Sequence, residues 1–501
     1  MSAAGMAPLL VWPLTLVGLA GWLGLHLIST PRQAGFVAWW FGVAYFGASL
    51  HWLVEPFLVD LARHGWMAPF AVIFMAGGLA LIWGLFMWLV MWLAGRFAPG
   101  RNGRAGQAGR AGWVLALGAA ELTRAHLFTG FPWASPVQAL IDTPMAAALA
   151  WIGPYGLMVA FAMMAALVQW AAAQRRLAAL LAPAAVGGAL SLAALAAPDT
   201  RPETLPETWP EIRPDTLAQT RPQAPLIRIV QPNAAQRDKW DPVKAPMFFQ
   251  RALKLSSAAP KPDLVIWPES AVATWLSRAG PAFELMSAAT GTPMITGINA
   301  DAAGRAYNAL VVLDDTGNPR LRYDKHHLVP FGEYIPLPGL LRALGLQTFT
   351  QASGYGFSAG PGPQVLDLGA LGHALPLICY EAVFPHDLRT ATRPDWVLQI
   401  TNDAWFGNFA GPQQHLVQAR MRAIETGLPL IRAANTGISA LIDARGRVQA
   451  ALPLNVAGRL DVRLPAPAPP TLYSRTGDLP VAVLLIVGIV TVTLRTRRES
   501  V

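Results

Sequence analysis

The amino-acid sequence predicts a multi-span α-helical membrane domain joined to an α/β domain that lies outside the cytoplasm. The chain has 501 residues, of which 53% are hydrophobic and 13% charged, whereas soluble domains carry roughly 25% charged residues. The deficit is concentrated in residues 1–197, which hold nine arginines, four acidic residues and no lysine. From Leu226 onward, short β-rich runs alternate with helical stretches. The first part of the chain is therefore suited to lipid and the second to water.

Apolar stretches occur where a bilayer core of ~30 Å would need ~20 helical residues. We expect about six spans in a membrane domain over 1–197 and a seventh near the C-terminus. The stretches are 7–29, 35–54, 68–95, 112–128, 144–170, 177–197 and 479–494. Glu121, Arg124 and His126 interrupt the fourth, which is either a span facing a polar cavity or a short helix buried in the bundle. The first stretch lacks a charged n-region and a clear cleavage site, so it predicts a span rather than a signal peptide.

Arginine placement predicts the orientation, because Lys and Arg in short loops stay cytoplasmic. Arg32, the cluster at 96–110, the pair at 175–176 and the basic tail at 495–501 all fall on one side if the spans alternate. The large segment between the sixth and seventh spans then lies outside the cytoplasm. The net charge of +9 could suggest a nucleic-acid partner, but the basic residues flank apolar runs, so we expect none.

A Pro-rich linker over 198–225 is followed by the α/β domain over 226–470. Prolines recur in the linker at four-residue spacing, which favours an extended spacer. An amphipathic helix is expected over 412–427, and DARG at 443–446 suits a hairpin turn. The expected strands are 226–231, 263–270, 293–299, 308–315, 373–381, 395–403 and 437–450.

Three chemically suggestive residues lie at strand ends, where sites form in α/β sheets. Glu269 follows an apolar run, Lys325 follows a strand and precedes a Pro- and Gly-rich loop, and Cys379 closes another strand. A carboxylate, an amine and a thiol can together perform acyl transfer, as base, oxyanion partner and nucleophile. Each residue alone is more typical of a surface acid, a solvated lysine or a core cysteine. The single cysteine excludes an intramolecular disulfide and cysteine-based metal clusters.

The motifs around these residues resemble the catalytic signatures of the nitrilase, or carbon-nitrogen hydrolase, superfamily. They are WPES with Glu269, YDKHHLVPFGEY with Lys325 and Glu333, and ICYE with Cys379. Further motifs resemble one branch, the apolipoprotein N-acyltransferases: TGFPW (129–133), KWDP (239–242), TNDAWFG (401–407), QARMRAIETGLPLIRAANTGIS (418–439) and YSRTGDLP (473–480). Members of that branch commonly have another apolar segment ahead of 7–29, giving eight spans where this chain shows seven.

The resemblance implies a nitrilase-like αββα sandwich and a location in the bacterial inner membrane, with the catalytic domain on the periplasmic side. It implies that a phospholipid acylates Cys379 and that the thioester then acylates the α-amine of a lipoprotein's N-terminal diacylglyceryl-cysteine. Glu269 would be the base, while Lys325 and the Tyr380 N–H would stabilise the oxyanion. Glu333 would position Lys325 or assist proton transfer. Glu381 would support the nucleophile or only start a helix.

Two rival functions use the same residues differently. A membrane-anchored nitrilase-type amidohydrolase would pass the acyl group to water, and a non-enzymatic scaffold would retain the residues without using them. The motifs of the membrane half argue against the hydrolase, and the complete residue set argues against the scaffold.

Candidate substrate-lining aromatics are Trp240, Trp133, Phe357 and Trp405, which could equally be core residues or interfacial anchors. The Gly-rich stretch 348–363 is either a lid or a surface loop. We expect no metal at His326 and His327, because adjacent histidines point apart and no Asp/His cluster completes a ligand set. No GxxxxGK[ST] motif occurs, so we expect no nucleotide and no other cofactor.

Overall fold

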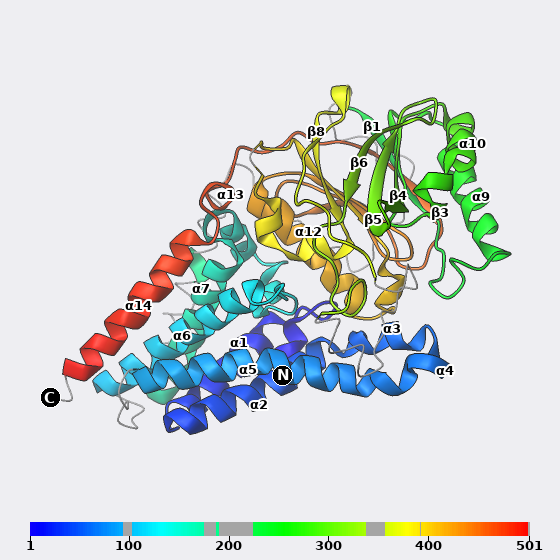
Figure 1. The fold of residues 1–501 in the computed structure, drawn as a ribbon. Helices are drawn as coiled ribbons and strands as arrows, with labels where there is room; N and C mark the ends of the chain where they lie inside the picture. The colour runs from blue at the N-terminus through cyan, green and yellow to red at the C-terminus, as the bar shows by residue number, and fades with distance from the viewer. Residues whose placement is uncertain (94–102, 175–186, 190–223, 337–355, 391, 499–501) are drawn as a thin grey trace. The chain divides into compact units, whose positions relative to one another are not determined.

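A computed structural model describes the whole chain except residues 94–102, 175–186, 190–223, 337–355, 391 and 499–501. Contacts between residues divide it into two compact units, which Figure 1 draws as helices and as strands with flanking helices. The helical unit comprises Met1–Thr204, Phe409–Thr426 and Pro470–Val501. The sheet unit comprises Leu205–Asn408 and Gly427–Pro469.

In the described residues, the helical unit contains two long apolar helices, or three if one bent pair is counted, where seven apolar stretches were expected. Leu61–Leu93 and Pro144–Gln174 are long and apolar enough to cross a membrane, and Pro31–Ser49 with His51–Leu58 forms a third candidate bent by 66°. Leu479–Leu494 is a shorter apolar helix. The principal helices are α1 (Trp12–His26), α2 (Pro31–Ser49), α5 (Ala68–Leu93), α6 (Gly103–His126), α7 (Leu149–Gln174), α12 (Gly411–Thr426), α13 (Leu472–Thr476) and α14 (Leu479–Arg498).

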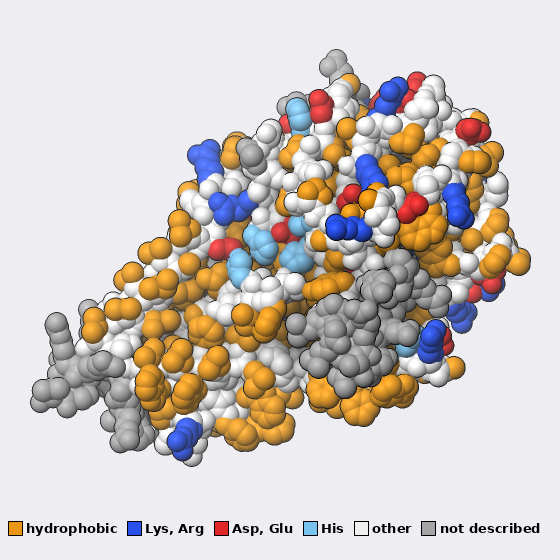
Figure 2. Space-filling view, viewed as in Figure 1, with side chains coloured by type: hydrophobic (Ala, Val, Ile, Leu, Met, Phe, Trp, Pro, Cys, Tyr) orange, Lys and Arg blue, Asp and Glu red, His pale blue; other side chains and the backbone are white. Residues whose placement is uncertain are grey.

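Hydrophobic side chains cover much of the visible surface of this unit (Figure 2). Large apolar residues on α2, α5 and α14 are more than half exposed, among them Phe36 at 61%, Phe74 at 73% and Ile486 at 63%. Such a surface is unfavourable in water and suits a lipid environment. The expected span 177–197 and the linker 198–225 lie almost entirely outside the described residues.

The charged residues of the fourth apolar stretch lie on α6, where two of them face the interior of the helical unit. Glu121 and Arg124 are 1% and 2% exposed and form an ion pair of 2.7 Å. Trp83 Nε1 donates to Glu121 at 2.8 Å, and Arg124 donates to the Trp133 carbonyl at 2.7 Å. Buried charges persist when they are paired in this way. Of the two readings left open, the structure favours a helix with its charges buried in the bundle.

Helix α12 differs from its expected amphipathic character. Every residue from Gln414 to Thr426 is buried, including the polar ones. Gln414 accepts hydrogen bonds from the indoles of Trp52 and Trp133, and Arg420 pairs with Asp142 at 2.7 Å. The polar side chains of an amphipathic helix usually face solvent. Those of α12 instead bind partners within the helical unit. The expected strands on either side of α12 belong to the sheet unit instead.

The sheet unit contains two sheets. One has the order β13-β1-β2-β4-β5-β6, with β3 also paired to β4, and the other has the order β12-β11-β10-β9-β8-β7. The strands of the first sheet are β1 (Leu226–Gln231), β2 (Leu264–Ile266), β3 (Val272–Trp275), β4 (Met294–Ala302), β5 (Arg305–Leu313), β6 (Pro319–Asp324) and β13 (Gly458–Arg463). Those of the second are β7 (Leu366–Asp367), β8 (His373–Ile378), β9 (Trp396–Thr401), β10 (Leu430–Ala434), β11 (Ser439–Ile442) and β12 (Val448–Leu452).

An apolar core joins the two sheets, with residues such as Ile229 and Ile266 from the first packed with Ile378 and Ile400 from the second. A second core on the other face of the first sheet includes Trp267, where helices α9 (Lys244–Ser256) and α10 (Gly280–Thr290) cover it. These are the layers of a sandwich. β1, β2 and β4 run parallel, as do β8, β9 and β10. Parallel order places the carboxyl ends of β2, β8 and β9 where a site can form.

Candidate active site

The sheet unit brings Glu269, Lys325 and Cys379 together, although the first and the last are 110 positions apart in the chain. Glu269 follows β2, Lys325 follows β6 and Cys379 follows β8. They are 7%, 1% and 5% exposed. Lys325 Nζ lies 3.9 Å from Glu269 Oε1, and the Cys379 thiol interacts electrostatically with both. A carboxylate, an ammonium and a thiol are thus assembled out of contact with bulk solvent.

Hydrogen bonds from two asparagines fix the Glu269 carboxylate. The Asn402 N–H donates to Oε2 at 2.8 Å, and Asn308 Nδ2 donates to Oε1 at 2.7 Å. Burial raises the pKa of Glu269, Lys325 lowers it and Glu333 raises it, and the pKa stays above the ordinary value. A raised pKa makes the carboxylate a better proton acceptor near neutral pH.

Glu333 is the direct partner of Lys325. Its two oxygens lie 2.9 and 2.8 Å from Lys325 Nζ, and one also accepts the Val329 N–H at 2.8 Å. Burial lowers the pKa of Lys325, but the negative charges of Glu333, then Glu269 and Cys379, raise it by more. The pKa of Lys325 therefore lies above its ordinary value. The lysine is therefore a permanent cation. Of the two roles left open for Glu333, this geometry favours positioning Lys325.

Cys379 occupies a sharp turn between β8 and the short helix η10 (Cys379–Val383). Its φ of 51° lies in the left-handed region, which costs a non-glycine residue on the order of 1–3 kcal/mol. Gln399 Nε2 donates to the Cys379 carbonyl at 3.2 Å, and Arg432 in turn holds Gln399 at 2.6 Å. Burial raises the pKa of the thiol, as does Glu269, while Lys325 lowers it, and the pKa remains above the ordinary value. The resting group is a thiol that needs a base.

Glu381 holds the turn at Cys379 through hydrogen bonds. It is fully buried and accepts hydrogen bonds from the Ile378 N–H at 2.7 Å, the His326 N–H at 2.8 Å and the Tyr323 hydroxyl at 2.9 Å. It therefore links the strand before Cys379 to the loop after Lys325, besides starting η10. Tyr380 is buried too, with its ring edge-on to Phe384 at 4.9 Å, so its side chain is part of the packing.

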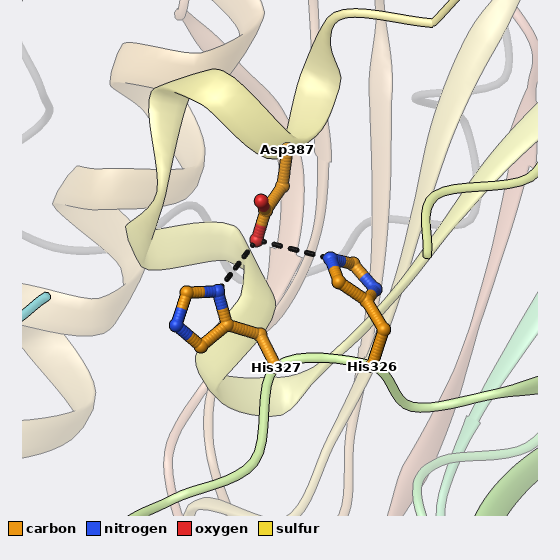
Figure 3. A group of neighbouring side chains, drawn as sticks. All are labelled: His326, His327 and Asp387. Carbon is orange, nitrogen blue, oxygen red and sulfur yellow. Dashed lines mark hydrogen bonds and ion pairs between the residues drawn. The ribbon is translucent and has the colours of Figure 1, made fainter. Parts of the chain in front are cut away.

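His326 and His327 do not point apart, contrary to the expectation from sequence. Both imidazoles converge on Asp387, with His326 Nε2 at 3.2 Å and His327 Nδ1 at 3.0 Å from Asp387 Oδ2 (Figure 3). The reason is that they lie in an irregular loop, where the alternation of a strand does not apply. An Asp therefore does complete a set that could hold a metal ion. His326 Nδ1 also lies 2.7 Å from Glu381 Oε1, so an ion pair connects the set to the turn at Cys379.

The four aromatic candidates for substrate lining differ in environment. Trp240 is 45% exposed, and Trp405 is half-buried in the short helix η12 (Asp403–Trp405). Phe357 is buried against Ala306 and Leu328, and its N–H donates to the Glu333 carbonyl at 2.7 Å. Trp133 belongs to the helical unit, where its ring lies 4.8 Å from that of Trp52. The first half of the stretch 348–363 lies outside the described residues, which resume at Gly356.

Sequence reasoning missed three residues that contact the site. Asn308 bridges Glu269 and Glu333, at 2.7 and 3.0 Å, Asn402 holds Glu269, and the Lys239 ammonium donates to the Glu269 carbonyl at 2.9 Å. Asn402 and Lys239 lie in the motifs TNDAWFG and KWDP, so the motifs contained a signal that residue chemistry alone did not.

Gly297 on β4 allows the Glu269 turn to approach the sheet. A Cβ there would lie 2.5 Å from Ser270 N, 2.6 Å from Glu269 Cα and 2.8 Å from the Pro268 carbonyl oxygen, all main-chain atoms. We expect Gly297→Ala to displace Glu269 and slow the reaction at Cys379 by about 100-fold, the order that a 1 Å misplacement can cost. Gly280→Ala is the matched control, since its Cβ would meet nothing within 4 Å. Equal activity of the two variants would contradict this role of Gly297.

The His326 cluster predicts a pH-dependent stability. Burial lowers the pKa of His326, but hydrogen bonds to Asp387 and Glu381 raise it to about 10. Because the folded-state pKa of His326 is raised, its charged form stabilises the fold. This stabilisation is fully present below the unfolded-state pKa of about 6.5 and is lost as the pH rises through about 10. The melting temperature of His326→Gln should therefore fall furthest below wild type near pH 6, with the gap closing toward pH 10.

A chelator distinguishes hydrogen bonding from metal binding in the same cluster. If hydrogen bonds alone hold it, EDTA should leave the melting temperature of the wild-type protein unchanged. A drop with EDTA in wild type that is absent in His326→Gln would instead show that the cluster binds a metal ion.

Comparison with known proteins assigns both parts of the chain. Residues 226–466 match the carbon-nitrogen hydrolase family, and residues 1–167 match the apolipoprotein N-acyltransferase N-terminal domain. The apolipoprotein N-acyltransferases of Rhodopseudomonas palustris and Caulobacter vibrioides are 37% and 35% identical to this chain, and each alignment covers 99% of it and 94% of the relative. The solved amidase from Nesterenkonia sp. is 18% identical with a TM-score of 0.38, covering 52% of this chain and 97% of its own. The sequence relatives extend through both units, and the chain belongs to the apolipoprotein N-acyltransferase family.

Proposed function

We propose that this protein transfers an acyl chain from a membrane phospholipid to the α-amine of the N-terminal diacylglyceryl-cysteine of a lipoprotein. The observation that carries the proposal is the buried set of Glu269, Lys325, Glu333 and Cys379, in a chain whose two parts both match the family. Its curated relatives are named apolipoprotein N-acyltransferases. The reaction would be the last step of lipoprotein maturation and would need no cofactor.

The first half-reaction acylates the enzyme. Glu269 takes the thiol proton, and the Cys379 sulfur attacks the ester carbonyl of the phospholipid, forming a C–S bond. The oxyanion that develops is stabilised by the Lys325 ammonium and the Tyr380 N–H. When the C–O bond breaks, the leaving alkoxide takes the proton from Glu269 and departs as a lysophospholipid. A thioester remains on Cys379.

The second half-reaction acylates the acceptor. The lipoprotein amine attacks the thioester carbonyl through the same oxyanion site and loses a proton to Glu269. The C–S bond then breaks, and the proton returns to the Cys379 sulfur. Exclusion of water favours the amine over hydrolysis, and Cys379 at 5% exposure meets that requirement. Trp240, Phe357 and Trp405, and Trp133 from the helical unit, are the candidates for binding the acyl chains.

The membrane arrangement follows from the same proposal. A helical domain over 1–197 and a helix over 479–494 would hold the protein in the bacterial inner membrane, with the basic tail 495–501 in the cytoplasm. The linker 198–225 and the domain 226–470 would then lie on the periplasmic side. Apolar helices such as Leu61–Leu93 and Pro144–Gln174 and the clustered arginines support this arrangement.

A membrane-anchored amidohydrolase is the alternative, since it would use the same residues and release the acyl group to water. The match of residues 1–167 to the N-terminal domain of acyltransferases favours transfer. Burying the ion pairs around Cys379 is costly to stability, and such arrangements are typical of sites that perform chemistry. This disfavours an inactive scaffold.

Mass spectrometry of the intact protein tests the proposal. After incubation with phospholipid, the enzyme should gain the mass of one acyl chain, and Cys379→Ala should gain none because the chain has no other cysteine. A diacylated lipopeptide should then discharge the adduct as an amide. Release only as free fatty acid, with lipopeptide present, would favour the hydrolase. Failure of any phospholipid to form an adduct would contradict the thioester mechanism.

A further inference from the structure

A second lysine is buried beside the proposed catalytic set, which consists of Glu269, Lys325, Glu333 and Cys379. Lys239 lies between β1 and α9 and is 5% exposed. Lys239 and Lys325 are the two lysines with buried side chains in the described part of the chain. Burying an ammonium is unfavourable unless nearby groups compensate for its charge. Some negative charge near Lys239 must therefore compensate for its buried ammonium.

The neighbours of Lys239 along the chain pair with one another instead of with it. Lys244 lies 2.7 Å and Arg237 3.8 Å from Asp238, and Asp241 accepts the N–H groups of Val243 and Lys244. Lys239 points the other way, and Nζ donates to the Glu269 carbonyl oxygen at 2.9 Å. Burial lowers the pKa of Lys239 to about 8, against the opposing effects of Glu269 and Cys379. It is thus mostly protonated at neutral pH and faces the catalytic set.

Asp403, which also raises the pKa of the Cys379 thiol, is paired with Arg432, so these two buried charges cancel. The charges of the remaining groups, Glu269, Glu333 and Lys325, balance only when Lys239 is included. Glu269 and Glu333 bring two negative charges, and Lys325 brings one positive charge. Lys239 supplies the second positive charge and makes the resting set neutral. Transfer of the thiol proton to Glu269 leaves the total unchanged and moves a negative charge to sulfur, then to the oxyanion. In a region of low dielectric, an excess negative charge would oppose both species.

We propose that Lys239 is a positioning residue and the second cation of the active site. It holds the main chain of Glu269 and offsets the charge of the second carboxylate, so that the thiolate and the oxyanion form in a neutral set. The proposal rests on Cys379 being the nucleophile of the proposed function. It does not depend on which acyl donor or acceptor is used.

Alkylation of the lone cysteine by iodoacetamide measures thiolate formation without any natural substrate. In the full-length protein, the rate as a function of pH gives the midpoint of the thiolate-dependent reaction of Cys379. Lys239→Gln keeps an N–H donor for the Glu269 carbonyl but removes the charge, so the midpoint should move to higher pH by about one unit and the rate at pH 7 should fall about tenfold. Lys239→Arg keeps the charge and should retain the wild-type midpoint.

The controls separate charge from folding. Lys261→Met removes an exposed lysine of the same unit and should change neither the midpoint nor the melting temperature. Lys239→Met should reproduce the shift of Lys239→Gln and replaces it if the glutamine variant does not fold. A folded Lys239→Gln or Lys239→Met with a wild-type midpoint would overturn the proposal, as would an equal shift in Lys239→Arg. Failure of acyl transfer with an intact alkylation profile would instead count against the proposed substrates.

Discussion

The candidate site depends on one constraint, that two carboxylates and the lysines beside them are buried together and must compensate for one another's charge. Lys325 Nζ contacts both oxygens of Glu333 within 2.9 Å and lies 3.9 Å from Glu269. Asn308 spans the two carboxylates, which fixes their separation. Because these groups follow or lie on β2, β5 and β6, the sheet order that joins those strands is also what assembles the charges. Removal of one partner would leave a buried charge uncompensated.

The Cys379 thiol is held by a separate framework on the second sheet. Cys379 adopts a left-handed conformation, and its carbonyl is fixed by Gln399 of the neighbouring strand. Arg432 on the next strand contacts both Gln399 and Asp403, so three adjacent strands determine where the thiol lies. Glu381 joins this framework to the loop that follows Lys325. The strain at Cys379 is maintained because hydrogen bonds on both sides leave the turn no alternative.

The sequence predicted the parts of this arrangement that depend on local pattern. The strand 226–231 and the hairpin at 443–446 match the structure, because alternation and turn residues act over a few positions. Asn308, Asn402 and Lys239 were missed, since an amide or amine gains its role only from carboxylates far away in the chain. The predictions that α12 has a polar face and that His326 and His327 point apart were wrong for a related reason. Each assumed that a side chain's direction follows from its element, whereas partners elsewhere determined its environment.

Burial raises the pKa values of both Glu269 and Cys379, and this bears on how a buried thiol could lose its proton. What matters is the difference between donor and acceptor, and a proton passing from sulfur to Glu269 leaves the total charge of the set unchanged. Low dielectric therefore opposes ionisation into solvent more than it opposes transfer within the set. The thiolate can then form mainly by proton transfer to Glu269, and any step that displaces this carboxylate leaves the cysteine protonated.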